Sequence, residues 1–199
     1  MTRHVCVAAV LLAASGCSGS TTAPSANAQT LHGEVSDPTG DALSDPRVPV
    51  SPDLVHATVN VAAGNIAFVV QLAPGTLNRQ TTRVTVLLDT DQDGSTGIRQ
   101  ADGLGADYGL DLAASTGQAS VNKADPAGCA VHLSCFNPIG SAVITFVPDG
   151  MQVTVPLSLL GNGDGRMSFQ LNAYVIVAPL TPIIFDFMPD SNLPPGRVE

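Results

Sequence analysis

The residues of this sequence that could do chemistry are concentrated in one aspartate-rich segment. Asp89, Asp91 and Asp93 alternate with other residues, and Gly94 follows directly. Alternate carboxylates in a tight loop can converge on one cation, and a glycine allows the sharp turn that brings them together. The segment therefore predicts a Ca²⁺ site.

The second half of this segment departs from a complete helix–loop–helix calcium motif. Gln100 stands at the twelfth position, where such a loop carries a bidentate glutamate. Other oxygen donors must then complete the site, and the candidates are Asp102, Asp107 and the turn Asp37-Pro-Thr-Gly-Asp41. We assign Asp107 and Asp41 to the site. The alternative is a turn whose aspartate side chains bond their own backbone.

Two cysteines, Cys129 and Cys135, are close together in the sequence. In an exported protein, an even pair of cysteines predicts a disulfide that closes a small loop. A metal site with His132 is the alternative, but two cysteines and one histidine lack the fourth ligand of a tetrahedral zinc site. We therefore predict the disulfide. We expect no haem, because no Met/His or Met/Lys pair is evident.

No set of residues predicts an enzyme. Leu87-Leu88-Asp89-Thr90 resembles the beginning of an aspartic protease motif, but Asp91 stands where that motif has glycine. Gly140-Ser141-Ala142 is not the Gly-x-Ser-x-Gly elbow of a serine hydrolase. Glycoside hydrolysis needs two placed carboxylates, and aspartates in turns do not by themselves indicate such a pair. An envelope hydrolase is therefore our third hypothesis for the function.

β-Strands must position these residues, because the apolar residues of the segment 31–199 recur with a period of two. The strands that this period predicts are 55–61, 66–72, 82–88, 108–112, 118–122, 142–147, 151–155, 167–177 and 183–187. A short helical turn is expected at 156–160. Short strands between Gly, Pro and Asp turns indicate a β-sandwich or a β-barrel. We expect one all-β domain, an antiparallel sandwich with about eight or more strands.

Several of these segments together resemble the carbohydrate-binding family 9-like and DOMON-like β-sandwiches. The resemblance covers most of residues 34–190. The segments that carry it are Asp37-x-x-Gly40-Asp41, Pro52-Asp53-Leu54-Val55, Leu88-Asp89-Thr90-Asp91, Ser95-Thr96-Gly97, Gly105-Ala106-Asp107-Tyr108, Val155-Pro156-Leu157-Ser158-Leu159-Leu160-Gly161 and Ala178-Pro179. The resemblance implies a jelly-roll-like sandwich, structural Ca²⁺ and binding of sugar or, in some relatives, haem.

The aromatic residues depart from that resemblance. Sugar-binding modules stack pyranose rings on exposed aromatic faces, usually those of tryptophan, and this sequence has no tryptophan. Tyr108 is therefore the candidate for stacking on a ligand. The alternative is that Tyr108 is a half-buried strand residue.

The N-terminal segment carries the features of an export signal. Arg3 precedes the apolar run 5–14, which is too short to cross a bilayer. Ala14-Ser15-Gly16-Cys17 resembles the lipobox of bacterial lipoproteins, which implies that residues 1–16 are removed and that Cys17 is acylated. Residues 17–30 are polar and small, so we expect a flexible tether. The alternative is an ordinary secretory signal, cut nearby or after Ala28.

The charge of the chain argues against one class of partner, the nucleic acids. The chain has 17 acidic and 8 basic residues, a formal net charge of −9. Nucleic-acid binding needs Lys and Arg to neutralise phosphates, so we expect none. We expect the protein to contact the membrane through the lipid on Cys17. If the host is Gram-negative, we expect this membrane to be the outer membrane.

Together these features predict a non-catalytic binding or accessory lipoprotein of the cell envelope, stabilised by Ca²⁺. A glycan is the ligand that the resemblance implies, and we expect it at the loops of one end of the sandwich. The second hypothesis is a structural or protein-interaction lipoprotein without a small ligand.

Overall fold

The computed structural model describes residues 30–130, 135–161, 163–177, 181–190 and 192–199. The predicted export signal, Cys17 and nearly all of the predicted tether lie outside the described residues, as does His132. Within the described ranges, no helix has the length and apolar character needed to cross a membrane.

The described residues form β-strands, joined by turns and by short 3₁₀ helices. The strands are β1 (Leu31–Ser36), β2 (Leu54–Ala62), β3 (Asn65–Leu72), β4 (Thr82–Asp89), β5 (Ile98–Arg99), β6 (Gly105–Ala106), β7 (Tyr108–Ala113), β8 (Gln118–Ala124), β9 (Phe136–Val147), β10 (Gly150–Pro156), β11 (Met167–Val177), β12 (Thr181–Met188) and β13 (Gly196–Val198). The helices are η1 (Gly128–Ala130) and η2 (Leu157–Leu160). The helical turn expected at 156–160 is thereby confirmed.

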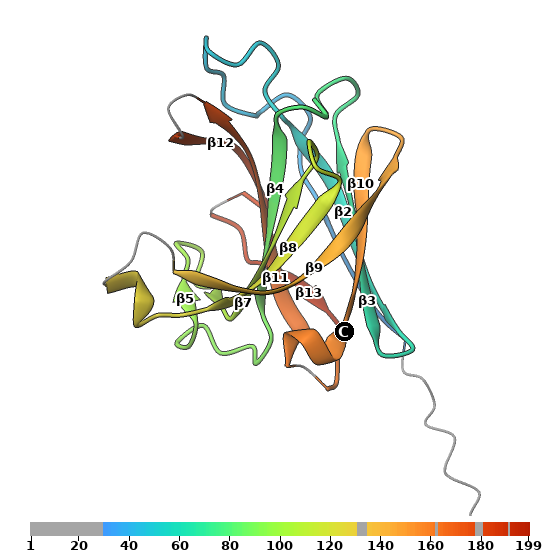
Figure 1. Cartoon of the computed structure of the whole chain (residues 1–199), viewed down its shortest axis with the longest axis vertical. Coiled ribbons are helices and arrows are strands. Elements are labelled where there is room, and N and C mark those ends of the chain that lie inside the picture. The colour runs from blue at the N-terminus through green and yellow to red at the C-terminus, as the bar shows by residue number, and fades with distance from the viewer. Residues whose placement is uncertain (1–29, 131–134, 162, 178–180, 191) are drawn as a thin grey trace, which may run out of the picture.

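The strands pair in an 11-stranded antiparallel sheet of order β1-β2-β3-β10-β9-β8-β7-β4-β11-β12, with β13 on β11, whereas β5 and β6 pair only with each other. Figure 1 shows that the sheet folds over into two layers. β9 serves both layers, because its first part, as far as Val143, pairs with β8 and Ile144–Val147 pairs with β10. The predicted all-β, antiparallel sandwich in one domain is confirmed.

The short strand β13 links the two layers. It pairs with β11, where Met167 faces Val198. Glu199 then exchanges two backbone hydrogen bonds of 3.1 Å with His32 of β1. A side chain at Gly33 would collide with the carbonyl oxygen of Arg197, so only glycine permits this close approach.

The inward side chains of both layers form the core. In β2 these are Ala57, Val59 and Val61, each at most 3 % exposed. Large side chains fill the space between the layers, and those with almost no exposed surface include Phe68, Ile66, Leu110, Leu112, Met151, Leu160 and Phe169. Each such side chain contributes about 1.5–3 kcal/mol through its burial. The period of two that predicts the strands is thus the pattern by which one face of each strand is buried.

Candidate functional site

The predicted cation loop leaves the end of β4 and returns to the start of β7. Asp89 is the last residue of β4, Asp107 stands just before β7, and Asp91 lies between them. One carboxylate oxygen from each of the three lies within 4.8 Å of the other two. Two oxygens on one Ca²⁺, each about 2.4 Å from the ion, are at most about 4.8 Å apart. We call these three residues the loop aspartates, and their spacing is compatible with one shared cation.

Glycines allow this loop to fold back on itself. Gly97 has a φ of 61°, in the left-handed region, and a Cβ there would collide with the carbonyl oxygen of Ala106. A Cβ at Gly94 would likewise collide with the carbonyl oxygen of Gly103. The close backbone approach brings residues 94–97, which follow Asp91, against the segment that leads to Asp107, and Asp107 N–H donates to Leu88 O of β4 at 2.8 Å.

The predicted ligand Asp93 does not join the loop aspartates. Its Oδ1 accepts hydrogen bonds from the backbone N–H of Ser95, at 3.0 Å, and from the Ser95 hydroxyl, at 2.6 Å. These bonds hold the pKa of Asp93 below its usual range. Asp93 is therefore occupied by turn hydrogen bonds, as the alternative interpretation of this segment expected for its aspartates.

The loop aspartates also accept hydrogen bonds from their own segment. The backbone N–H of Asp93 donates to Oδ1 of Asp89 at 3.1 Å and to Oδ1 of Asp91 at 2.9 Å. The N–H and hydroxyl of Thr90 both donate to Oδ2 of Asp107, each at 3.0 Å. Burial, the contact with the Asp91 carboxyl and the charge of Asp107 raise the pKa of Asp89 to about 6. Both interpretations of this segment keep support, and the Ca²⁺ at the loop aspartates stays a prediction.

The assignment of Asp41 to this site requires a correction. Asp41 lies in the segment between β1 and β2, which passes beside β12, where Leu43 N–H donates to Phe185 O at 2.7 Å. Its carboxylate groups with Asp37 and Asp190, and also with Asp53 and Asp186, instead of with the loop aspartates. Asp102, the further donor considered, is likewise not grouped with the loop aspartates.

Tyr108 does not present its ring to solvent. It is 8 % exposed and belongs to the core between the layers. Its hydroxyl approaches Gly161, where an added Cβ would lie 2.6 Å from that oxygen. Stacking of a sugar ring on Tyr108 would require the core to open, so the structure favours the alternative, a buried strand residue.

The layer that contains β11 has an outward face, and this face carries a different aromatic residue, Tyr174 of β11. The core side of β11 is formed by its odd-numbered residues, such as Leu171 and Ala173, so Asn172 and Tyr174 point outward. Neighbouring strands continue this face with polar side chains. We call it the polar face, and its members are Arg83, Thr85, Asp111, Ser120, Asn122, Asn172 and Tyr174.

Hydrogen bonds hold the centre of the polar face in place. Arg83 and Asp111 form a salt bridge in which both side chains are about one quarter exposed. The Tyr174 hydroxyl donates to Oδ1 of Asp111 at 2.8 Å and accepts from Nε of Arg83 at 3.0 Å. Burial and the charge of Asp111 raise the pKa of Tyr174. The ring of Tyr174 is thereby fixed with one polar end against the sheet.

Two hollows adjoin each other on the polar face. One, of about 320 Å³, includes Asn172 and Ile184 in its lining, and the other, of about 310 Å³, includes Asp111 and Asn122. Thr85 and Tyr174 line both hollows. A larger hollow of about 460 Å³ lies by the 47–50 segment, outside the polar face, and its lining includes Arg47, Asn78 and Val175. The polar face therefore combines a fixed aromatic ring with carboxylate, amide and guanidinium groups.

Cys129 and Cys135 are joined by a disulfide, as predicted, with their Cα atoms 4.4 Å apart. The bond closes the connection between β8 and β9. A further hydrogen bond from Asp125 N–H to Cys135 O, at 2.8 Å, ties the same connection together. The cysteines thus have a structural role, and the alternative of a metal site with His132 is not needed to explain them.

Comparison with models of known protein families gives no match, and a search of curated proteins finds none that is significantly similar. The resemblance to carbohydrate-binding family 9-like and DOMON-like sandwiches therefore stays a prediction from the segments quoted above.

The sequence analysis missed the polar face, although its signal was present. The alternation in β11 places Tyr174 on the side opposite Phe169 and Leu171. The same alternation, applied to β4 and β7, places Arg83 and Asp111 outward. What the alternation cannot provide is the order of the strands, which brings these residues side by side.

Proposed function

We propose that this protein is a non-catalytic binding module of the cell envelope, anchored by lipid on Cys17, that binds a glycan on its polar face. The observation that carries the proposal is the fixed Tyr174 ring beside the Arg83–Asp111 pair, at the junction of two hollows. The face of a sheet thus replaces the loops of the sandwich as the binding surface.

The chemistry of the polar face suits a sugar. A pyranose presents apolar C–H groups on its ring face, which stack on aromatic rings, and hydroxyls around its rim. Asn172, Asp111 and Arg83 offer planar groups that donate or accept hydrogen bonds with such hydroxyls. Because Tyr174, Asp111 and Arg83 already hold one another, little side-chain freedom is lost on binding.

The location at the envelope rests on the N-terminal residues and on the disulfide. An apolar run followed by Ala14-Ser15-Gly16-Cys17 is typical of a lipoprotein signal. Disulfides persist in oxidising compartments outside the cytosol, and Cys129 is bonded to Cys135. Incorporation of labelled palmitate, abolished in Cys17→Ala, is the result expected for the anchor; equal labelling of both proteins would contradict it.

The ligand is tested by retention on insoluble polysaccharides and by titration with soluble oligosaccharides. Loss of one stacked ring costs about 0.5–1.5 kcal/mol beyond its buried area, so Tyr174→Ala is expected to weaken binding about tenfold. Tyr174→Phe keeps the ring and should retain most of the affinity. Gln152→Ala, on the outward side of β10, is the control for an unrelated change on the other layer.

Two results would contradict this function. If Tyr174→Ala binds as tightly as the unchanged protein, the ligand lies elsewhere. If no polysaccharide or oligosaccharide is retained and the protein instead captures a protein partner from envelope extracts, the structural or protein-interaction lipoprotein is the better description.

A further inference from the structure

A second set of carboxylates lies where an edge of one layer passes beside an edge of the other. After β1 ends at Ser36, the chain runs beside β12 before it enters β2. The backbone N–H of Leu54 donates to Oδ2 of Asp186 at 2.6 Å across this boundary. Five aspartates collect along it, and we call them the seam aspartates: Asp37, Asp41, Asp53, Asp186 and Asp190.

β-Bulges place residues of both strands into the seam. In β12, Asp186 pairs with Ala173 and Ile184 pairs with Tyr174, so Phe185 is an extra residue. A bulge lets two consecutive side chains turn toward the same side. Phe185 and Asp186 are accordingly both buried, at 1 % and 6 % exposure. A second register shift, between Leu54 and His56 of β2, lies directly beside Asp53.

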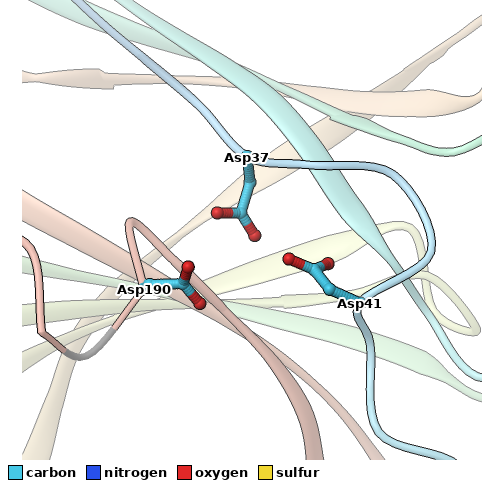
Figure 2. A group of neighbouring side chains, drawn as sticks. All are labelled: Asp37, Asp41 and Asp190. Carbon is cyan, nitrogen blue, oxygen red and sulfur yellow. The ribbon is translucent and has the colours of Figure 1, made fainter.

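The seam aspartates have the spacing of cation ligands. Oxygens of Asp37, Asp41 and Asp190 lie within 4.8 Å of one another, and Figure 2 shows their carboxylates turned toward a common centre. Oxygens of Asp41, Asp53 and Asp186 form a second group within the same limit. Both groups contain Asp41, which therefore stands at the middle of the cluster.

Some of these oxygens are buried without a partner. Asp53 is 5 % exposed; its Oδ2 accepts from the backbone N–H of Gly40 at 2.8 Å, but its Oδ1 has no hydrogen-bond partner among the described residues. Both carboxylate oxygens of Asp37 are in the same situation. A buried carboxylate oxygen without a partner is costly, and native structures rarely leave one without an explanation such as a bound ion.

Electrostatics adds to this cost. The ion pairs between described residues involve none of the seam aspartates. Five carboxyl groups therefore lie together at a place where these ion pairs supply no compensating positive charge.

We propose that the seam aspartates bind Ca²⁺, with Asp41 as the central ligand and the partnerless oxygen of Asp53 on the buried side. An all-oxygen set of carboxylates is the donor chemistry that Ca²⁺ prefers, whereas zinc and copper select histidine or cysteine. The ion fastens the segment after β1 to the end of β12. This site is separate from the polar face and does not depend on glycan binding.

Calorimetric titration of the full exported protein with Ca²⁺ tests the site. Asp41→Asn and Asp53→Asn each remove one ligand charge at almost constant size, and we expect each to weaken Ca²⁺ binding about tenfold or more, by analogy with losses around other metal sites. Asp45→Asn is the matched control, because Asp45 lies in the same segment but pairs with Arg47. Asp91→Asn controls for binding at the loop aspartates.

The proposal is wrong if Asp41→Asn and Asp53→Asn bind Ca²⁺ with the affinity and stoichiometry of the unchanged protein. If those variants fail to fold, limited trypsin digestion of the unchanged protein decides. Arg47 lies in the segment that carries Asp41, and Arg99 lies in the loop of the loop aspartates. Slower cleavage after Arg47 in Ca²⁺ than in chelator is expected. Protection of Arg99 alone, or of neither site, would overturn the proposal.

Discussion

The molecule contains two acidic clusters with similar spacing but different construction. The loop aspartates all belong to one connection, from Asp89 to Asp107. The seam aspartates come instead from two distant parts of the sequence, residues 37–53 and residues 186–190. Figure 1 shows the β5–β6 connection and the segment between β1 and β2 at different ends of the sandwich. The loop cluster is therefore a property of a local segment, and the seam cluster exists only in the folded chain.

The difference lies in how the carboxylates are satisfied. A tight turn supplies N–H and hydroxyl donors, so Asp91 and Asp107 accept hydrogen bonds from Asp93 and Thr90. Such bonds stabilise the ionised carboxylate without any ion. In the seam, oxygens of Asp37 and Asp53 lack such donors among the described residues. Equal spacing of oxygens is thus a weak indicator of a cation, and unsatisfied buried oxygens are a stronger one.

The largest expected effect is a loss of stability with rising pH in the absence of metal. The folded-state pKa is raised to about 7 for Asp186 and to about 6 for Asp37 and Asp89. The folded chain then binds more protons than the unfolded chain, so stability is highest below about pH 4 for these groups and falls as pH rises to about 7. One pKa unit corresponds to about 1.4 kcal/mol for a group shielded from solvent, and solvent screening makes the contribution of the partly exposed Asp37 smaller.

Thermal unfolding in chelator between pH 5 and pH 8 measures this effect. Asp186→Asn should flatten the pH dependence more than Asp89→Asn, because the raised pKa is higher in the seam. If Asp89→Asn flattened the pH dependence as much as Asp186→Asn, or more, the distinction between the two clusters would be wrong.

Addition of Ca²⁺ is expected to have the next largest effect. An ion present at about 100 times its dissociation constant stabilises the folded state by about 2.7 kcal/mol. For a domain of this size, that corresponds to a rise of about 5–10 °C in Tm. Asp41→Asn should lose most of this rise and Asp91→Asn should keep most of it, as measured by calorimetric melts in Ca²⁺ and in chelator. The reverse pattern would make the loop aspartates the main cation site.

A backbone change should affect the loop cluster alone. Gly97→Ala forces a side chain into the left-handed region, at about 1–2 kcal/mol, and against the carbonyl of Ala106. Gly117→Ala is the control, since Gly117 has a φ of 64° but nothing within 4 Å of its added Cβ. We expect Gly97→Ala to lower the unfolding free energy more than Gly117→Ala, in denaturant titrations. Ca²⁺ binding at the seam should survive both changes.

The smallest effect is expected for Asp91→Asn in chelator. Asp91 is exposed, and an asparagine oxygen can still accept the bond from Asp93 N–H. Exposed substitutions of this kind usually change stability by less than about 0.5 kcal/mol. A loss of several kcal/mol in denaturant unfolding would show that the loop aspartates form a stronger network than their local hydrogen bonds indicate.

Much of the fold could be predicted from alternation alone. The hairpins around Gly64 and Asp149 and the long strand β11 carry apolar residues at every second position, and each strand was found. β1 escaped prediction because Gly33 occupies one of its inward positions, which hides the pattern. β13 escaped because three residues are too few for a period, and its place depends on β11 and β1.

The candidate sites were less accessible to prediction for a physical reason. The loop aspartates lie in one short segment, so their spacing in the sequence was enough to predict that they group. Asp93 is the exception, because its carboxylate accepts hydrogen bonds from Ser95 instead. Asp37 and Asp190 are brought together only by the closing of the sandwich, and no local pattern reports it. Tyr174 and Asp111 likewise meet because β4 lies between β7 and β11.

The position of β13 also has a consequence for the order in which the chain assembles. β1 is an early segment, and its hydrogen-bonded partner Glu199 comes after every other strand. The outer backbone groups of His32 therefore become paired only when residues 196–199 are in place. A chain interrupted before that segment would present two unprotected strand edges, which are templates for aggregation. Formation of β13 thus protects part of each of these two edges.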